Sequence, residues 1–366
     1  MRLLPRPPAP RIVPCPSVRS RLLLVYVIAA VGLPNCGGGG SPTSPGTPSP
    51  SYPVTAVVFY DENGNGVMDA DESIRLPEVD VEVAGKVGRS EKLTGRAVVN
   101  GVPVGSYPVS VRASSLPPFY TAGAVPAITV PQAAGSEAAR PLALSIGDNV
   151  PNSYLAFGDS ISIGEGARTT DGYRDVLELL LAQNLGGRHR VIDDGVSGNK
   201  SDQGADRIEV SLRRSRPAYT LILLGTNDWN KGPCKTTAPP CFTLDSLRFM
   251  IQATRAYKSL PVISTIIPAN PSATPPERNE WVTAMNELIK TMARQEGAAL
   301  ADSHAAFMKA GNLPSLFFDH VHPNDAGYQL IAGAFFTAIA RPPAATTAGW
   351  AVPSLFLSPT ATSDGR

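Results

Sequence analysis

The sequence has few cysteines, few histidines and no excess of charge of either sign. Its 366 residues include 4 Cys and 4 His, and 32 Lys and Arg balance 31 Asp and Glu to a net charge of +1. Such a balance gives no sign of a nucleic acid, an anionic membrane surface or a polyanionic substrate as partner. The hydrophobic fraction of 43% and the charged fraction of 17% indicate a folded chain long enough for two domains. The function must therefore be inferred from a site.

The apolar run near the N-terminus is too short to cross a bilayer comfortably. Leu22 to Val31 follows Arg11, Arg19 and Arg21 and precedes the segment Leu33 to Cys36, whereas a spanning helix needs about 20 apolar residues. This layout predicts a signal peptide over residues 1–36. The residues before Cys36 resemble a bacterial lipoprotein box, which implies lipidation of Cys36 as the membrane attachment. Plain secretion is the alternative. Residues 37–52, rich in Gly, Ser, Thr and Pro, predict a flexible linker.

The remaining cysteines flank a short Pro-rich loop. Cys15 and Cys36 belong to the export segment, which leaves Cys234 and Cys241. In an oxidising compartment this pair favours a disulfide over a metal site, because a metal site would need more ligands. A pair of free thiols is the alternative.

Residues 53–147 have the pattern of a small all-β sandwich. Short alternating or β-branched runs are broken by Gly, Pro and Asn, and no stretch has a helical period. The expected strands are Val54–Tyr60, Val79–Val83, Arg96–Val99, Tyr107–Arg112 and Ala127–Val130.

One acidic loop in this region meets the calcium-loop pattern. Its expected ligands are Asp61, Asn63, Asn65, Val67 through its carbonyl, Asp69 and Glu72, with Gly66 at the tight turn. The flanks are strand-like, unlike the helices of an EF-hand. With the Leu-Pro-x-Val-x-Val-x-Val run that follows and a later Gly-x-Tyr-x-Val, the region resembles calcium-binding B-type repeats of bacterial surface proteins and related prealbumin-like sandwiches. The resemblance implies a structural Ca²⁺; a solvated hairpin loop is the alternative.

Residues 150–341 alternate apolar strands with amphipathic helices, which predicts an α/β fold with a parallel sheet covered on both faces. Residues 342–366 predict a disordered tail. Expected strands are Tyr154–Phe157, Val191–Asp193, Leu221–Leu224, Val262–Ile266 and Ala298–Leu300. Expected helices are Tyr173–Leu185, Ser201–Arg214, Leu244–Ser259, Glu277–Glu296 and Asp325–Ala340.

Four short motifs follow these strands or precede the last helix. They are Gly158-Asp159-Ser160, Gly195-Val196-Ser197-Gly198, Gly225-Thr226-Asn227-Asp228 and Asp319-His320-Val321-His322-Pro323. In order, placement and Asp-x-x-His spacing they resemble the blocks of the SGNH (GDSL-type) hydrolases. The resemblance implies a three-layer, flavodoxin-like hydrolase domain and a serine esterase that needs no cofactor for catalysis.

The chemistry agrees with the roles that the resemblance assigns. A serine hydroxyl needs an imidazole to take its proton and a carboxylate to orient that imidazole. The family pattern implies Ser160 as nucleophile with Asp319 and His322 as partners. It also implies the amides of Ser160 and Gly198 and the side chain of Asn227 as oxyanion donors.

Each of these residues also has a structural explanation. Ser160 would suit a helix N-cap, and Gly198 and Asn227 would suit turns. Since His322 satisfies the spacing from Asp319, His320 is expected to be a subsite or surface residue.

The substrate stays open among acetylated carbohydrate, short-chain ester, thioester and lysophospholipid, because a fold does not choose among them. The polar, Pro-rich loop from Asn230 to Phe242 favours small acyl groups or sugars. Two non-enzymatic alternatives are a surface or carbohydrate-binding protein with a hydrolase-like domain and a calcium-dependent adhesion module.

Overall fold

The computed structural model describes residues 49–236 and 238–343. The predicted signal peptide, Cys36 and most of the predicted linker and tail lie outside the described residues. Strand β1 begins at Ser51, so it takes in the last two residues of the predicted linker. Ser51 and Tyr52 are part of β1 because they pair with Pro103 and Val102 of strand β4.

A five-stranded parallel sheet lies at the centre of the C-terminal region. Its order is β11-β10-β12-β13-β14, the arrangement of flavodoxin-like folds. Every neighbouring pair is parallel, which confirms the predicted parallel α/β sheet. The strands are β10 (Val150–Gly158), β11 (Arg190–Gly195), β12 (Pro217–Leu223), β13 (Leu260–Ser264) and β14 (Ala299–Ala301).

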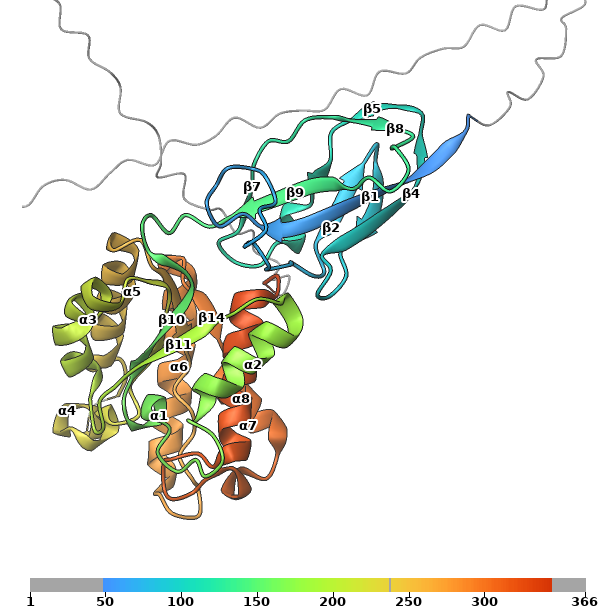
Figure 1. Ribbon diagram of the computed structural model, residues 1–366. Coiled ribbons are helices and arrows are strands. Elements are labelled where there is room, and N and C mark those ends of the chain that lie inside the picture. The colour runs from blue at the N-terminus through green and yellow to red at the C-terminus, as the bar shows by residue number, and fades with distance from the viewer. Residues whose placement is uncertain (1–48, 237, 344–366) are drawn as a thin grey trace, which may run out of the picture. The chain divides into compact units, whose positions relative to one another are not determined.

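Helices cover both faces of this sheet. Helices α2 (Tyr173–Leu185) and α8 (Asp325–Ala340) pack on one face, and α3 (Ser201–Ser215), α5 (Thr243–Ala256) and α6 (Pro276–Glu296) pack on the other. Figure 1 shows α3 and α5 on the opposite side of β10 from α2 and α8.

Successive strand residues face opposite helical layers. Ala156 of β10 belongs to the core that contains Tyr173 and Phe335, whereas its neighbour Phe157 belongs to the core that contains Met250. Burial on both faces explains why these strands are apolar throughout instead of alternating with polar residues.

Short helices join the main elements near the sequence motifs. They are α1 (Ser160–Ile163), η2 (Asp228–Asn230), α4 (Gly232–Thr236), α7 (Ser303–Ala310) and η3 (Leu313–Leu316). Among the helices that the structure describes, none combines the length and the apolar character needed to cross a membrane.

The region before β10 consists of strands and one 3₁₀ turn, η1 (Ala113–Ser115). The sheets have the orders β4-β1-β9-β7, β3-β2-β6 and β5-β8. The predicted strand over 107–112 is split at Pro108, which has no N–H to donate. The strands are β1 (Ser51–Tyr60), β2 (Asp80–Val83), β3 (Lys86–Arg89), β4 (Arg96–Pro103), β5 (Gly105–Tyr107), β6 (Ser110–Val111), β7 (Thr121–Ala122), β8 (Ile128–Val130) and β9 (Ala138–Ala143).

Candidate active site

Ser160 lies at the point where the strand order of the parallel sheet reverses. It is the first residue of α1 and follows the carboxyl end of β10, which pairs with β11 on one side and with β12 on the other. In open α/β sheets, ligands bind in the crevice at this kind of position. The segments that carry Gly198 and Asn227 follow the carboxyl ends of β11 and β12, so they reach the same edge of the sheet.

Three side chains form a continuous hydrogen-bonded chain at this edge. The Oγ of Ser160 lies 2.9 Å from Nε2 of His322, and Nδ1 of His322 lies 2.8 Å from Oδ2 of Asp319. Because the carboxylate of Asp319 can only accept a hydrogen bond, Nδ1 of His322 must carry the ring proton. Nε2 is then free to accept the proton of the serine hydroxyl. Ser160 is 5% exposed, so its hydroxyl is held in a largely buried position.

Asp319 is held as an anion. Burial alone would raise the pKa of its carboxyl group, but hydrogen bonds from the ring and backbone N–H of His322 and from the backbone N–H of Val321 lower that pKa to about 2. The carboxylate is therefore charged at neutral pH and can orient the imidazole and stabilise an imidazolium.

Backbone contacts fix the loop that carries this pair. The N–H of Phe318 donates to the carbonyl of His322, and the side chain of Asn270 donates to the carbonyl of Asp319. After the loop, Asn324 caps helix α8 by accepting hydrogen bonds from two backbone N–H groups of its first turn. Asn270, outside the four motifs, thus ties the loop to the segment that follows β13.

Asp159 fixes the nucleophile turn. It is fully buried, caps α1 by accepting a hydrogen bond from the N–H of Ile161 at 2.9 Å, and accepts another from Nδ2 of Asn227 at 3.1 Å. Burial raises the pKa of Asp159 to about 7, against the lowering effect of the Ile161 N–H and of His322. Asp159 therefore connects the first motif to the third.

The two other expected oxyanion donors lie beside this turn. Gly198 has a φ of +74°, which a residue with a side chain rarely adopts, and a Cβ added there would meet nothing within 4 Å. The backbone conformation, and not crowding by other protein atoms, calls for glycine at this position.

Asn227 already uses its side-chain N–H groups. They donate to the carboxylate of Asp159 and to the backbone carbonyl of Asn199, each at 3.1 Å. Donation to an oxyanion therefore requires one of these hydrogen bonds to be shared or exchanged when substrate binds.

Arg207 of α3 ties these segments together. Its guanidinium donates to the carbonyl of Gly158 at 2.7 Å and to the side chain of Asn199 at 2.9 Å, and it stacks 4.0 Å over the ring of Phe157. Asp194 of β11 lies 3.5 Å away as its ion partner. Sequence reasoning missed Arg207, because a single arginine on an amphipathic helix gives no signal of such a role.

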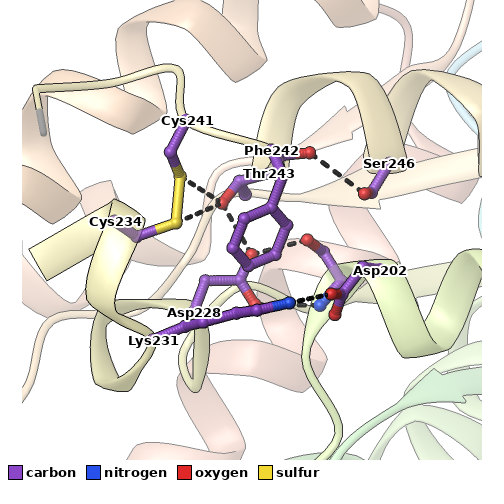
Figure 2. The surroundings of a disulfide bond; sticks show 9 residues. Asp202, Asp228, Lys231, Cys234, Cys241, Phe242, Thr243 and Ser246 are labelled. Carbon is purple, nitrogen blue, oxygen red and sulfur yellow. Dashed lines mark hydrogen bonds and ion pairs between the residues drawn. A yellow bond between two sulfur atoms is a disulfide. The ribbon is translucent and has the colours of Figure 1, made fainter.

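A disulfide joins Cys234 to Cys241 near the third motif. Figure 2 shows Thr243 between this disulfide and Asp228. The hydroxyl of Thr243 donates to the buried carboxylate of Asp228 at 2.6 Å and lies 3.2 Å from Sγ of Cys241. Asp228 also accepts hydrogen bonds from Ser201, so it links the segment after β12 to the start of α3.

The other histidines take no part in this chain of hydrogen bonds. His320 is 53% exposed, and its Nδ1 lies 3.7 Å from Oδ1 of Asp319. His189 contacts the hydroxyl of Tyr154, and His304 is the second residue of α7; burial lowers the pKa of both.

A second carboxylate faces His322. Oε2 of Glu165, in the loop after α1, lies 3.3 Å from Nε2 of His322. Sequence reasoning missed Glu165 because it lies outside the four motifs, although the Gly-Glu-Gly sequence directly after the nucleophile segment marks a tightly turning loop.

The loop expected to bind calcium has its polar groups paired with one another. Asp61 accepts hydrogen bonds from the N–H groups of Asn65 and Gly66, while the side-chain amides of Asn63 and Asn65 both donate to Oδ2 of Asp69. Glu72 accepts from two backbone N–H groups of the loop, and Val67 is exposed. In the described part of the chain, no group of three or more His, Cys, Asp or Glu side chains is arranged to hold a metal ion.

Comparison with known proteins identifies relatives for the C-terminal region. Residues 156–330 match the family described as "GDSL-like Lipase/Acylhydrolase family". The chain is 31% identical over 146 residues to Esterase TesA of Pseudomonas aeruginosa, which covers 40% of this chain and 67% of that enzyme. It is 25% identical over 158 residues to an acetylxylan esterase of Geobacillus stearothermophilus, which covers 41% and 72%. A crystal structure of TesA superposes with a TM-score of 0.41 and 26% identity, covering 51% of this chain and 97% of that one.

Proposed function

Since this chain belongs to the GDSL-like lipase/acylhydrolase family and is a carboxylic ester hydrolase, we propose that it cleaves esters through Ser160, His322 and Asp319. The observation that carries the proposal is the unbroken chain from the hydroxyl of Ser160 through the imidazole of His322 to the carboxylate of Asp319, with contacts of 2.9 and 2.8 Å. This is the arrangement that nucleophilic catalysis by serine requires.

The reaction proceeds in two halves. Oγ of Ser160 attacks the carbonyl carbon while its proton moves to Nε2 of His322. The tetrahedral intermediate collapses, the bond to the leaving alcohol breaks, and His322 returns the proton to that alcohol. Water then attacks the acyl-enzyme by the same route, which releases the acid and restores Ser160.

The negative charge on the intermediate needs hydrogen-bond donors. We assign them to the backbone N–H groups of Ser160 and Gly198 and to the side chain of Asn227. In the described hydrogen bonds, neither of the two backbone N–H groups donates to another protein group, which supports this assignment. Asn227 joins them by sharing one of its N–H groups between its present acceptor and the oxyanion.

The substrate class that we propose is a short acyl ester or an acetyl ester of a carbohydrate. The segment from the end of η2 through α4 exposes Asn230, Lys231 and Lys235, and so offers little apolar surface for a long acyl chain. One relative is named as an acetylxylan esterase, which agrees with this class.

The remaining proposals concern the location and the β region. The export segment and the Cys234–Cys241 disulfide support an exported enzyme.

The paired sheets of residues 51–143 support a β-sandwich. The convergence of Asn63, Asn65 and Asp69 supports a structural Ca²⁺ site in the loop after β1. The side-chain oxygens of Asn63 and Asn65 accept hydrogen bonds from the backbone N–H groups of Asn65 and Val67, so binding of the ion through these oxygens would require both hydrogen bonds to be released.

The direct test is hydrolysis of p-nitrophenyl acetate by the purified protein and by Ser160→Ala and His322→Ala. We expect each variant to lose several orders of magnitude in kcat, because members of a catalytic triad act as one unit. The matched control is His320→Ala, which removes the neighbouring histidine and should keep most of the activity. Hydrolysis that survives in Ser160→Ala would contradict the proposed role of Ser160, and a parent protein that hydrolyses nothing would favour a binding protein.

A further inference from the structure

We infer that Glu165 is a specificity-determining residue that faces the leaving group of the substrate. It selects uncharged or cationic leaving groups that carry hydroxyl donors, such as sugars and other polyols, and disfavours leaving groups with a phosphate or carboxylate near the ester. This inference rests on the proposed roles of Ser160 and His322.

The position of Glu165 follows from the path of the proton. His322 must deliver the proton from Nε2 to the leaving oxygen, so that oxygen lies next to Nε2 when the ester bond breaks. Oε2 of Glu165 lies 3.3 Å from the same nitrogen. The carboxylate therefore lies within a few ångströms of the leaving group.

The backbone of Glu165 is fixed at both of its polar groups. Its N–H donates to the carbonyl of Ser160 at 3.0 Å, and its carbonyl accepts a hydrogen bond at 2.6 Å from the hydroxyl of Tyr328, a fully buried residue of α8. The side chain is thus held beside His322 by the same turn that presents the nucleophile.

The next residue, Gly166, packs the loop against the loop that carries His322. A Cβ at Gly166 would lie 2.6 Å from the carbonyl oxygen of Pro323 and 3.2 Å from Cβ of His322, and its φ is +93°. Only glycine allows this close approach, so the distance between Glu165 and His322 is set by packing on both sides.

The carboxylate is available to a ligand. The side chain of Glu165 is 40% exposed, and among the described residues His322 is the one basic side chain within ion-pair distance of it. A carboxylate accepts hydrogen bonds from hydroxyl groups and is attracted to cations, whereas a second anion at close range is repelled. Salt weakens that repulsion because the site is open to solvent.

The test compares acetyl thioesters whose leaving groups differ in charge. S-acetylthioglycolate and its amide differ by a carboxylate near the leaving sulfur, and acetylthiocholine supplies a cation. We expect Glu165→Gln to raise the ratio of kcat/KM for the anionic over the neutral substrate roughly tenfold, and to lower the ratio for the cationic substrate. The matched control is Asp206→Asn, which removes one exposed carboxylate from the outer side of α3 and should change neither ratio.

Hydroxyl recognition has its own pair of substrates. Glycerol monoacetate and propyl acetate differ by two hydroxyl groups, and Glu165→Gln should raise KM several-fold for the first with little change for the second. A Glu165→Gln enzyme that hydrolyses esters with unchanged ratios would overturn the inference while leaving the proposed function intact. If Glu165→Gln hydrolyses nothing, the salt dependence of the wild type decides instead. The inference is overturned if the wild type discriminates against the anionic substrate equally strongly at low and at high salt. Failure of the proposed function is recognised separately, by activity that persists in Ser160→Ala.

Discussion

Asp159 shows how one buried carboxylate shapes both the nucleophile turn and an oxyanion donor. It caps α1 through the N–H of Ile161 and holds Nδ2 of Asn227. An asparagine at 159 could still accept from Ile161, but its own amide nitrogen would then face the amide nitrogen of Asn227. The side chain of Asn227 would have to turn its oxygen toward residue 159.

We therefore predict that Asp159→Asn lowers kcat by about tenfold to a hundredfold. This decrease in kcat is no larger than the decrease expected when one oxyanion donor is removed. The measurement is steady-state hydrolysis by Asp159→Asn, Asn227→Ala and the double variant. If Asp159 acts through Asn227, the double variant is no slower than Asn227→Ala. Losses that multiply would show that the two residues act independently.

The same variant reports on pH. Burial raises the pKa of Asp159 to about 7 in the folded protein, against about 3.9 in the unfolded chain. Between these values the folded state holds more protons, so stability falls as pH rises from about 4 to about 7. Because Asp159→Asn lacks this titration, urea unfolding should show the wild type losing stability relative to the variant from pH 5 to 7 and levelling above. A difference that does not change with pH would contradict this assignment.

Sequence patterns singled out residues that the fold brings together, but not their neighbours. The Asp-x-x-His spacing pointed to Asp319 and His322; their side chains contact each other, and His322 also contacts Ser160. Glu165 and Arg207 reach the same site from a loop and a helix face. Their positions depend on how these segments pack, which no local spacing encodes.

At the scale of elements, long periodic segments were predictable and short ones were not. The bounds of α2 and α8 agree with the expected helices at both ends because each has a continuous apolar stripe. Helices α1, α4 and α7 were missed, since four to eight residues hold too little of a helical period. Strand β9 was missed because Pro141 interrupts its strand pattern. In the structure Pro141 nevertheless lies opposite Phe59 of β1 in the parallel ladder.

The disulfide stabilises the segment after β12. It constrains the loop that precedes Thr243, whose hydroxyl donates to Asp228 next to Asn227. Removing it frees this loop in the unfolded chain and loosens the contact with Asp228 in the folded one.

We predict that the double variant Cys234→Ser, Cys241→Ser has a lower Tm, with a loss of unfolding free energy of about 2–3 kcal/mol at most, because the closed loop is short. Thermal unfolding with and without a reductant provides the measurement. The reductant should lower the Tm of the wild type and leave the double variant unchanged. Equal Tm values for wild type and double variant would mean that the bridge contributes nothing.

At the scale of the whole molecule, the proposed tasks fall in different regions. Every residue assigned to ester hydrolysis lies in the region of the parallel sheet, after a strand or before α8, while the loop proposed to bind Ca²⁺ follows β1 in the all-β region. No step of the proposed reaction passes through that loop. Calcium would thus act on the stability of the chain and not on the chemistry.

The corresponding prediction separates stability from activity. If Ca²⁺ binds the folded loop and not the unfolded chain, millimolar Ca²⁺ raises the Tm and a chelator lowers it, as linkage requires. Esterase rates measured well below the Tm should be equal with Ca²⁺ and with chelator. The matched variant is Asp69→Asn, because Asp69 accepts hydrogen bonds from both loop amides and its charge would be needed by the metal; it should abolish the shift in Tm. A Tm that is independent of Ca²⁺ would favour the solvated hairpin loop, and rates that fall with chelation would place the metal in the catalytic cycle after all.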